Sequence, residues 1–328
     1  MIRNQWYVVL KSTEVGKKPI GVTRMGEKLV FWRGQGGEVQ CMRDQCPHLG
    51  APLHLGKVVD GALQCPFHGF EFDPGGQCRH IPALGRSGDI PRAMRAGGYF
   101  TYEAEGFIWI YWGEAAEKPP APAYFDNLGS QFSYMDFVQH WPVHYSRVVE
   151  NQLDVMHLPF IHATTIGRGG RAVVEGPLVR YKDGQLDLWV YNRLDDGTPP
   201  RKMEDLPEPD RHPFLVFLFP NLWMNWISDN IRVIVAFVPV DDENMLFYGR
   251  FTQNMTRLPV VRDLFNAMGV IGSIQIANQD RRVVSYQRPK RTSLKKMGEK
   301  LTQGDRGVLT YRTIRHSLMV ASGQIEKD

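Results

Sequence analysis

Cysteine is scarce in this chain, and its scarcity excludes a disulfide scaffold. Four cysteines stand among 328 residues, at positions 41, 46, 65 and 78, whereas small disulfide-stabilised proteins are far richer in this residue. A long apolar run is lacking as well, because the most apolar stretch, 213–227, is interrupted by Pro220, Asn221 and Asn225. No positively charged and then apolar leader opens the chain. We therefore expect a soluble, cytoplasmic protein.

The chain also lacks a strong excess of charge. Lysine and arginine number 39 against 35 aspartates and glutamates, which gives a net charge of +4. No block is overwhelmingly basic, so the composition gives no reason to expect a nucleic-acid partner. One run, 288–300, holds six basic residues. It is interpreted either as a solvated face or as a docking site for an acidic protein partner.

The apolar pattern predicts two domains. Short apolar runs at 6–10, 28–32 and 107–112, separated by Gly-rich turns, predict an all-β domain over 1–115. The Pro- and Ala-rich stretch 116–124 is typical of a linker. In the remainder, 125–328, helical patterns at 143–157 and 260–286 accompany strand patterns at 186–191, 214–219, 231–240 and 245–252. This mixture predicts an α+β domain with a substantial antiparallel sheet. We expect segment 193–212 to be a mobile loop that could act as a lid.

Two short boxes in the first domain carry metal-binding residues. The first reads Cys46-Pro-His48 and the second Cys65-Pro-Phe-His68. Two thiolates suit one iron and two neutral imidazoles suit another, which is the ligand set of a Rieske 2Fe–2S cluster. Four ligands of these types also suit zinc. Zinc fingers, however, usually pair Cys with Cys and His with His, which disfavours a zinc-stabilised interaction protein.

A second constellation follows the linker. Asn151, Asp154 and His157 are spaced three apart, so they are expected near one helical face. His162 comes after Pro159, and we expect the proline to break the helix so that both imidazoles can face one metal. Two histidines and one carboxylate on one face of an ion form the facial triad of non-haem iron(II) oxygenases.

The boxes, followed by this second motif, resemble those of the Rieske-type aromatic-ring-hydroxylating oxygenases. The likeness covers residues 6–113 and extends to the pattern Asn-x2-Asp-x2-His-x4-His. Leu49 departs from it, because many members carry arginine there. The resemblance implies an N-terminal all-β Rieske domain followed by a helix-grip catalytic domain. It assigns Cys46, His48, Cys65 and His68 to the cluster.

The resemblance also assigns the mononuclear iron site. It implies His157 and His162 as ligands and a third ligand on a late helix, for which Asp280 is the best match and Asp263 the competing acid. It gives Asp154 the role of a bridge from a mononuclear-site histidine to His68 of a neighbouring subunit, and places Asn151 near the iron. Inward side chains of the sheet would line the substrate pocket, and the candidates are Trp223, Asn225 and Trp226.

In function, the resemblance implies a terminal oxygenase of aromatic compound catabolism, assembled as a homotrimer. It would use dioxygen and electrons from a reductase, with or without a ferredoxin and ultimately from NAD(P)H. The length of the chain is similar to that of members that work as monooxygenases or O- and N-demethylases, and ring cis-dihydroxylation is the alternative. A Rieske electron-transfer protein is a further alternative, but such a protein needs only the first domain.

Overall fold

The computed structural model describes residues 1–294 and 297–325. Lys295 and Lys296, which belong to the basic run predicted as a possible docking site, therefore lie outside the described residues. The chain forms two compact units, which divide between Pro122 and Ala123. Residues 113–132, all of them described, form no helix or strand.

The first unit is built from three small antiparallel sheets, as the alternation of apolar runs and turns predicted. Their strand orders are β1-β11-β10, β2-β3-β4-β9 and β5-β6-β7-β8. The strands are β1 (Gln5–Lys11), β2 (Ile20–Arg24), β3 (Glu27–Arg33), β4 (Val39–Arg43), β5 (Lys57–Val59), β6 (Ala62–Gln64), β7 (Glu71–Phe72), β8 (Cys78–His80), β9 (Gly98–Tyr99), β10 (Thr101–Ala104) and β11 (Phe107–Trp112). Three 3₁₀ turns lie between them, η1 (Ser12–Glu14), η2 (Leu53–Leu55) and η3 (Pro82–Leu84).

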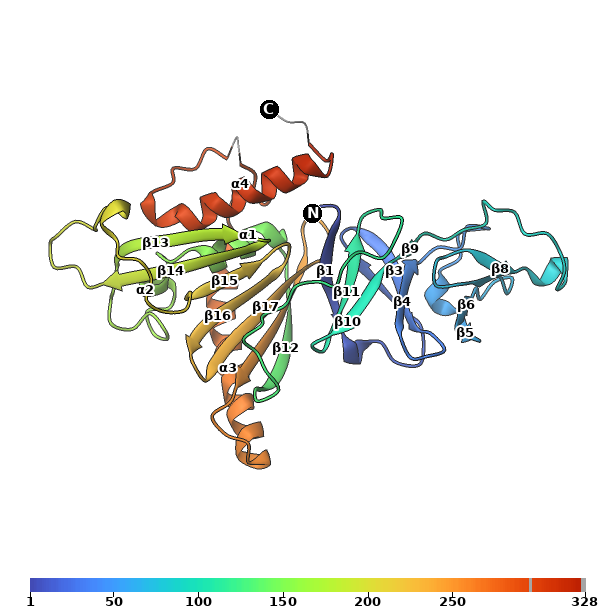
Figure 1. Cartoon of the computed structure of the whole chain (residues 1–328), viewed down its shortest axis with the longest axis horizontal. Helices are drawn as coiled ribbons and strands as arrows, with labels where there is room; N and C mark the ends of the chain where they lie inside the picture. The colour runs from blue at the N-terminus through green and yellow to red at the C-terminus, as the bar shows by residue number, and fades with distance from the viewer. Residues whose placement is uncertain (295–296, 326–328) are drawn as a thin grey trace. The chain divides into compact units, whose positions relative to one another are not determined.

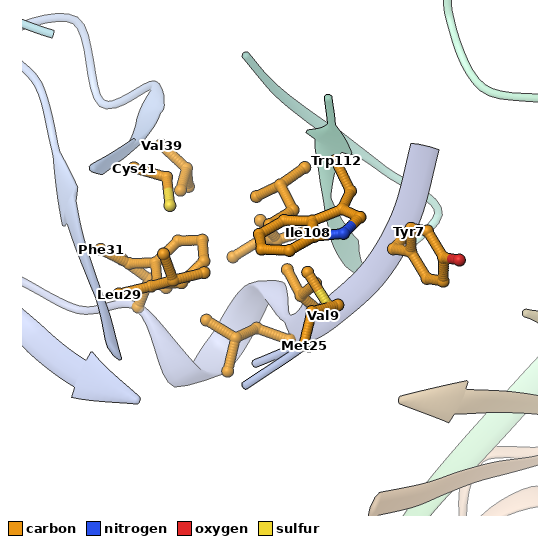
Figure 2. Packing of buried hydrophobic residues seen from close by; sticks show 12 residues of the cluster. Tyr7, Val9, Met25, Leu29, Phe31, Val39, Cys41, Ile108 and Trp112 are labelled. Atoms are coloured by element: carbon orange, nitrogen blue, oxygen red, sulfur yellow. The ribbon is translucent and has the colours of Figure 1, made fainter. Parts of the chain in front are cut away.

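Two apolar clusters stabilise this unit. Figure 2 shows one of them, in which Cys41 lies among the side chains of β1, β3 and β11. The Cys41 thiol is fully buried, and burial raises its pKa well above the usual value. It is therefore a core residue. The second cluster contains Cys46 and Cys65 together with Phe70 and Phe72, so the metal-binding boxes rest on a packed apolar base.

The second unit contains a seven-stranded antiparallel sheet of order β12-β18-β17-β16-β15-β14-β13 (Figure 1). Its strands are β12 (Ser133–Trp141), β13 (Val173–Lys182), β14 (Gln185–Arg193), β15 (Leu215–Leu218), β16 (Leu222–Ser228), β17 (Ile231–Pro239) and β18 (Met245–Gln253). Its helices are α1 (Tyr145–Leu153), α2 (Leu158–Ile161), α3 (Pro259–Val284) and α4 (Arg306–Ala321), with 3₁₀ turns η4 (Met203–Asp205) and η5 (Gln303–Asp305). The predicted α+β architecture is confirmed.

One face of this sheet carries the helices. Phe217 and Trp223 are cross-strand partners and therefore share a face. The Phe217 ring lies 5.5 Å from that of Tyr311 in α4, and the Trp223 indole donates to the carbonyl of Gln152 in α1. On β12, the Gln139 amide donates to Asn278 of α3 at 3.0 Å. The space between this face and the helices is where the second constellation lies.

The predicted helix over 143–157 is too long. Helix α1 ends at Leu153, and Asp154 follows it in an extended conformation. Pro159 does not break a helix, as was predicted, but lies in the first turn of α2. Proline is tolerated there because the first turn does not require its missing N–H. Consequently Asn151 lies within α1, Asp154 caps its end, and His157 caps the start of α2.

Helix α3 is long and apolar enough to cross a membrane by length and composition alone, although only 17% of its most apolar window is buried. It also carries charged residues, among them Arg262, Asp263 and Asp280. Phe265 packs near Phe251 of the sheet. We therefore interpret α3 as a helix of the folded catalytic unit.

Candidate metal centres

Each box of the first unit folds into a tight turn that begins at its cysteine. The Gly50 amide donates to the carbonyl of Cys46, and the Gly69 amide donates to that of Cys65. Both glycines have a positive φ, 76° and 73°, a conformation that other residues adopt only with strain. The sequence spacing of the boxes therefore becomes two turns of the same kind.

The four side chains of the boxes come together in this unit. The Cys46 and Cys65 thiols are buried and lie next to each other. The His48 and His68 rings are 4.7 Å apart, and Phe70 stacks on His48 at 4.8 Å. Both imidazoles are exposed at the surface. The sulfurs are thus buried in the unit and the imidazoles lie at its surface. This arrangement fits a 2Fe–2S cluster whose buried iron is bound by the cysteines and whose surface iron is bound by the histidines.

Burial raises the pKa of the Cys46 thiol to about 11, and the neighbouring Cys65 thiol acts in the same direction. A thiol whose pKa is raised in this way does not ionise easily without a nearby positive charge. Bound metal supplies that charge, since metal ligands of this type are thiolates. Cys78 is buried outside the boxes and burial also raises its pKa, in keeping with an ordinary core thiol.

In the second unit, three side chains from distant parts of the sequence converge. Ligand atoms of His157, His162 and Asp280 all lie within 4.8 Å of one another. Oδ1 of Asp280 is 3.5 Å from Nε2 of His157 and 3.1 Å from Nε2 of His162. Atoms bound at about 2.1 Å to one ion, at right angles, would be about 3 Å apart. The arrangement therefore fits a single metal ion held by two imidazoles and a carboxylate.

Polar atoms without hydrogen-bond partners in these three side chains also indicate a metal site. Among the described residues, neither Oδ1 of Asp280 nor Nδ1 of His157 has a hydrogen-bond partner, although both atoms are buried. A buried carboxylate oxygen without a partner is costly. An ion bound between the three ligand atoms would remove that cost for Asp280.

Two glutamines that the sequence analysis missed hold this group in place. Gln152 of α1 donates to Oδ2 of Asp280 at 3.0 Å, which leaves Oδ1 directed at the histidines. Gln279, next to Asp280 on α3, lies with its amide oxygen 2.8 Å from Nδ1 of His162. The only sequence signal for either residue was its position inside a motif. Burial of His162 lowers its pKa, but the adjacent carboxylate of Asp280 outweighs burial and raises it.

Asp154 and Asn151 lie at the edge of the group. Oδ1 of Asp154 accepts the backbone N–H of Met156 at 2.7 Å, and Oδ2 is 3.4 Å from Nδ1 of His157. The Asp154 side chain remains 27% exposed, so its carboxylate also reaches solvent. Asn151 is partly buried, and its amide nitrogen has no hydrogen-bond partner among the described residues.

Asp263, the competing acid, does not join the group. It lies 17 positions before Asp280 on α3, which is about 25 Å along the helix at 1.5 Å per residue. It is exposed and pairs with Arg262 at 2.7 Å. The structure therefore places Asp280, and not Asp263, beside the two histidines.

The three pocket candidates do not share one face of the sheet. Strand alternation places Trp223 and Asn225 on the helix-bearing face. Trp226 points to the opposite face, where Arg232 lies 3.5 Å from its ring centre and His212 stacks on it. This orientation corrects the expectation for Trp226, because the register turns its side chain away from the histidines.

The loop predicted at 193–212 is tied down at its start. Glu175 of β13 pairs with both Arg193 and Arg201. These contacts fix the base of the loop to the sheet. Whether the loop moves as a lid stays a prediction.

Comparisons with known proteins found matches to both units of the chain. Residues 5–95 match the model of the Rieske [2Fe-2S] domain, and residues 141–321 match that of the vanillate O-demethylase oxygenase C-terminal domain. Aminopyrrolnitrin oxygenase PrnD of Pseudomonas fluorescens is 36% identical over 169 residues, which cover 49% of this chain and 46% of the relative. The oxygenase component of dicamba O-demethylase of Stenotrophomonas maltophilia is 34% identical over 205 residues, covering 60% and 58%.

The fold has solved counterparts. The crystal structure of dicamba monooxygenase bound to dicamba superposes with a TM-score of 0.76 at 22% identity, covering 99% of each chain. This likeness confirms the predicted order of an all-β Rieske domain and a helix-grip catalytic domain. In sequence, the matched regions span about half the length of the curated relatives. Because one family model alone covers more than half of the chain, the protein belongs to the Rieske non-haem iron oxygenases with a catalytic domain of the vanillate O-demethylase type.

Proposed function

We propose that this chain is the terminal oxygenase component of a cytoplasmic system that oxidises a small, aromatic substrate with dioxygen. Electrons would come from a reductase, directly or through a ferredoxin, and ultimately from NAD(P)H. The reaction proposed is monooxygenation or O- or N-demethylation. The observation that carries the proposal is the convergence of His157, His162 and Asp280 in a chain that also contains the two Cys–His boxes.

In the proposed site, the chain supplies ligands and their orientation. His157, His162 and Asp280 would hold an iron(II) ion, which would supply open positions for dioxygen beside the substrate. Gln152 directs one oxygen of Asp280 toward the ion by binding the other. Asp154, whose Oδ2 lies 3.4 Å from Nδ1 of His157, would help to orient that ring when metal is bound. Fixed ligands of this kind let the site bind metal without reorganising.

Asp154 is proposed to connect the two centres across a subunit boundary. Its carboxylate faces His157 and remains partly exposed, and His68 is exposed at the end of the Rieske unit. In a head-to-tail homotrimer, His68 of a neighbouring copy would donate to Asp154. Heterologous contacts that close into a ring are the geometry such a trimer requires. One carboxylate between two imidazoles would fix both rings and shorten the path for electrons.

The substrate is proposed to bind between the helix-bearing face of the sheet and the iron ligands. Trp223 closes one side, since it is buried and its indole is anchored to α1. Among the described residues the side-chain oxygen of Asn225 has no partner, so it is free to accept a hydrogen bond from a substrate. A methyl group hydroxylated here would give a hemiacetal or hemiaminal, which loses formaldehyde and completes a demethylation.

The first test is the content of iron and acid-labile sulfide per chain, in protein produced with iron supplied. We expect about three irons and two sulfides. Asp280→Ala should retain about two irons and both sulfides, whereas the control Asp263→Ala, on the same helix, should retain three. Two irons in the unchanged protein, even after iron(II) is added, would refute the oxygenase assignment and favour an electron carrier. Zinc in place of iron and sulfide would refute both.

Turnover is the second test. Reduced protein would be supplied with oxygen and a panel of methoxylated and N-methylated aromatic acids and amines. Formaldehyde released in step with oxygen consumed would support demethylation. Substrate-dependent oxygen consumption that yields a cis-diol would instead assign ring dihydroxylation.

A further inference from the structure

The two histidines of the mononuclear site have chemically different partners. Nδ1 of His157 faces the carboxylate of Asp154 at 3.4 Å. Nδ1 of His162 faces the neutral carboxamide of Gln279 at 2.8 Å. The His162 side chain is only 2% exposed, so water does not compete for this position. The Nδ1 atom of one histidine therefore faces a charged group, whereas that of the other faces a neutral group.

Gln279 faces His162 with its amide oxygen, and its other neighbours accommodate this orientation. The Thr165 hydroxyl donates to Oε1 of Gln279 at 3.0 Å, while Nε2 of Gln279 points to the hydroxyl of Thr164 at 3.5 Å. Oε1 can only accept hydrogen bonds, so Nδ1 of His162 must carry the proton. Its other nitrogen, Nε2, then holds a lone pair directed toward Oδ1 of Asp280. This is the tautomer that binds a metal through Nε2.

We propose that Gln279 is a positioning residue of the iron site, which fixes the tautomer of His162 without adding charge. This proposal rests on the proposed function, because it takes His157, His162 and Asp280 as iron ligands. Iron(II), Asp280 and Asp154 carry charges that sum to zero. A second carboxylate behind His162 would leave one negative charge in excess, which favours iron(III) over iron(II). A carboxamide provides the hydrogen-bond acceptor and leaves the net charge of the site at zero.

The placement of Gln279 also explains how α3 organises the site. Gln279 and Asp280 are adjacent on one helix, so a single turn supplies a ligand and the group that orients a second ligand. His162 belongs to the segment after α2, more than a hundred residues earlier in the sequence. Docking of α3 on the sheet therefore sets the ligand and the tautomer in one step.

The test compares Gln279→Leu, which removes the acceptor at similar volume, with Gln279→Glu, which keeps an acceptor and adds charge. Gln275→Leu is the matched control, since Gln275 lies one turn earlier on α3 and is exposed. The dissociation constant of iron(II) is measured by competition with a chromophoric chelator on protein whose 2Fe–2S cluster is intact. The visible spectrum of the cobalt(II)-substituted protein reports ligand geometry independently of activity.

We expect Gln279→Leu to weaken iron(II) binding roughly 10- to 100-fold and to change the cobalt spectrum. Gln279→Glu should bind iron(II) at least as tightly as the unchanged protein and should favour iron(III) more strongly. Gln275→Leu should match the unchanged protein. If Gln279→Leu does not fold, Thr165→Val, which removes one donor to Oε1, should weaken binding in the same direction.

The proposal would be overturned if the dissociation constant of iron(II) for Gln279→Leu were within about threefold of that for the unchanged protein. Loss of a residue that orients a metal ligand changes metal affinity by more than this. Equal weakening by Gln279→Leu and Gln279→Glu would also overturn it, since the acceptor would then not be what matters. Failure of the proposed function looks different, because in that case the unchanged protein binds no iron(II) at this site.

Discussion

The buried ion network around Glu150 gives the sharpest stability prediction. Arg312 of α4 donates to both oxygens of Glu150 at 2.8 and 2.6 Å, and also to Glu299 at 2.7 Å. Arg147 lies 3.6 Å from Glu150 and 2.9 Å from Glu299. Both arginines are 4% exposed and Glu150 is 7% exposed. Two positive and two negative charges thus cancel in the interior, between α1 and α4.

Glu150→Gln leaves this group with one uncompensated positive charge at nearly unchanged shape. Removing one partner of a buried pair costs about 3–5 kcal/mol. Glu299 still neutralises one arginine, so we expect a loss near the lower limit, about 3 kcal/mol. In a domain of this size, that corresponds to a fall in melting temperature of roughly 6–12 °C.

The assay measures the free energy of unfolding of the catalytic unit in urea, with circular dichroism as the signal. It compares Glu150→Gln, Arg312→Gln and the double variant. The double variant removes one charge of each sign and restores neutrality. It should therefore be less destabilised than the sum of the singles, by at least about 1 kcal/mol. A loss below about 1 kcal/mol in Glu150→Gln, or strict additivity, would refute this account of the network.

Three further predictions concern the electron path, pH and the Rieske fold. Asp154→Ala should retain both iron sites yet stop turnover, and full activity would exclude the bridging role. Burial, with the charge of a nearby arginine, lowers the pKa of His144 to about 2. The unfolded chain binds its proton below a pH of about 6.5, so this histidine contributes stability above that pH and loses about 2 kcal/mol of it by pH 5. Unfolding free energies from pH 7.5 to 5 should depend less on pH in His144→Gln, with the exposed His140→Gln as control; an unchanged slope would contradict the assignment. Gly76 has φ +83°, and a Cβ there would lie 1.6 Å from the carbonyl oxygen of Ala96. Gly76→Ala should therefore destabilise the Rieske unit by about 3 kcal/mol and lower the visible absorbance of the cluster. Normal cluster content and an unchanged melting temperature would show that the backbone relaxes.

Some of the site could be predicted because its chemistry is local. The cluster ligands fall within two five-residue turns, each closed by a glycine, so their spacing alone identified the boxes. His157 and His162 were predicted as ligands by the resemblance, whose motif places them five positions apart. The helix pattern around them was less reliable. Periodicity continued past Leu153, but the chain leaves the helix there and Pro159 starts the next one.

Other parts of the site depended on contacts between distant segments. Asp280 meets the histidines only because α3 packs against the sheet, and periodicity alone did not distinguish it from Asp263. Gln152 and Gln279 have no pattern of their own, because a carboxamide acquires this role only when a ligand lies next to it. Trp226 was misplaced because one step in a strand reverses the face of a side chain.

The sequence by itself therefore indicated the class of protein and the candidate ligands of two kinds of metal centre, since these were carried by short motifs of neighbouring residues. Only the tertiary structure showed that Asp280, and not Asp263, lies beside the two histidines, which amides contact this group and which tryptophan faces it. Those choices follow from helix docking and strand register, in which residues more than a hundred positions apart are brought within hydrogen-bonding distance.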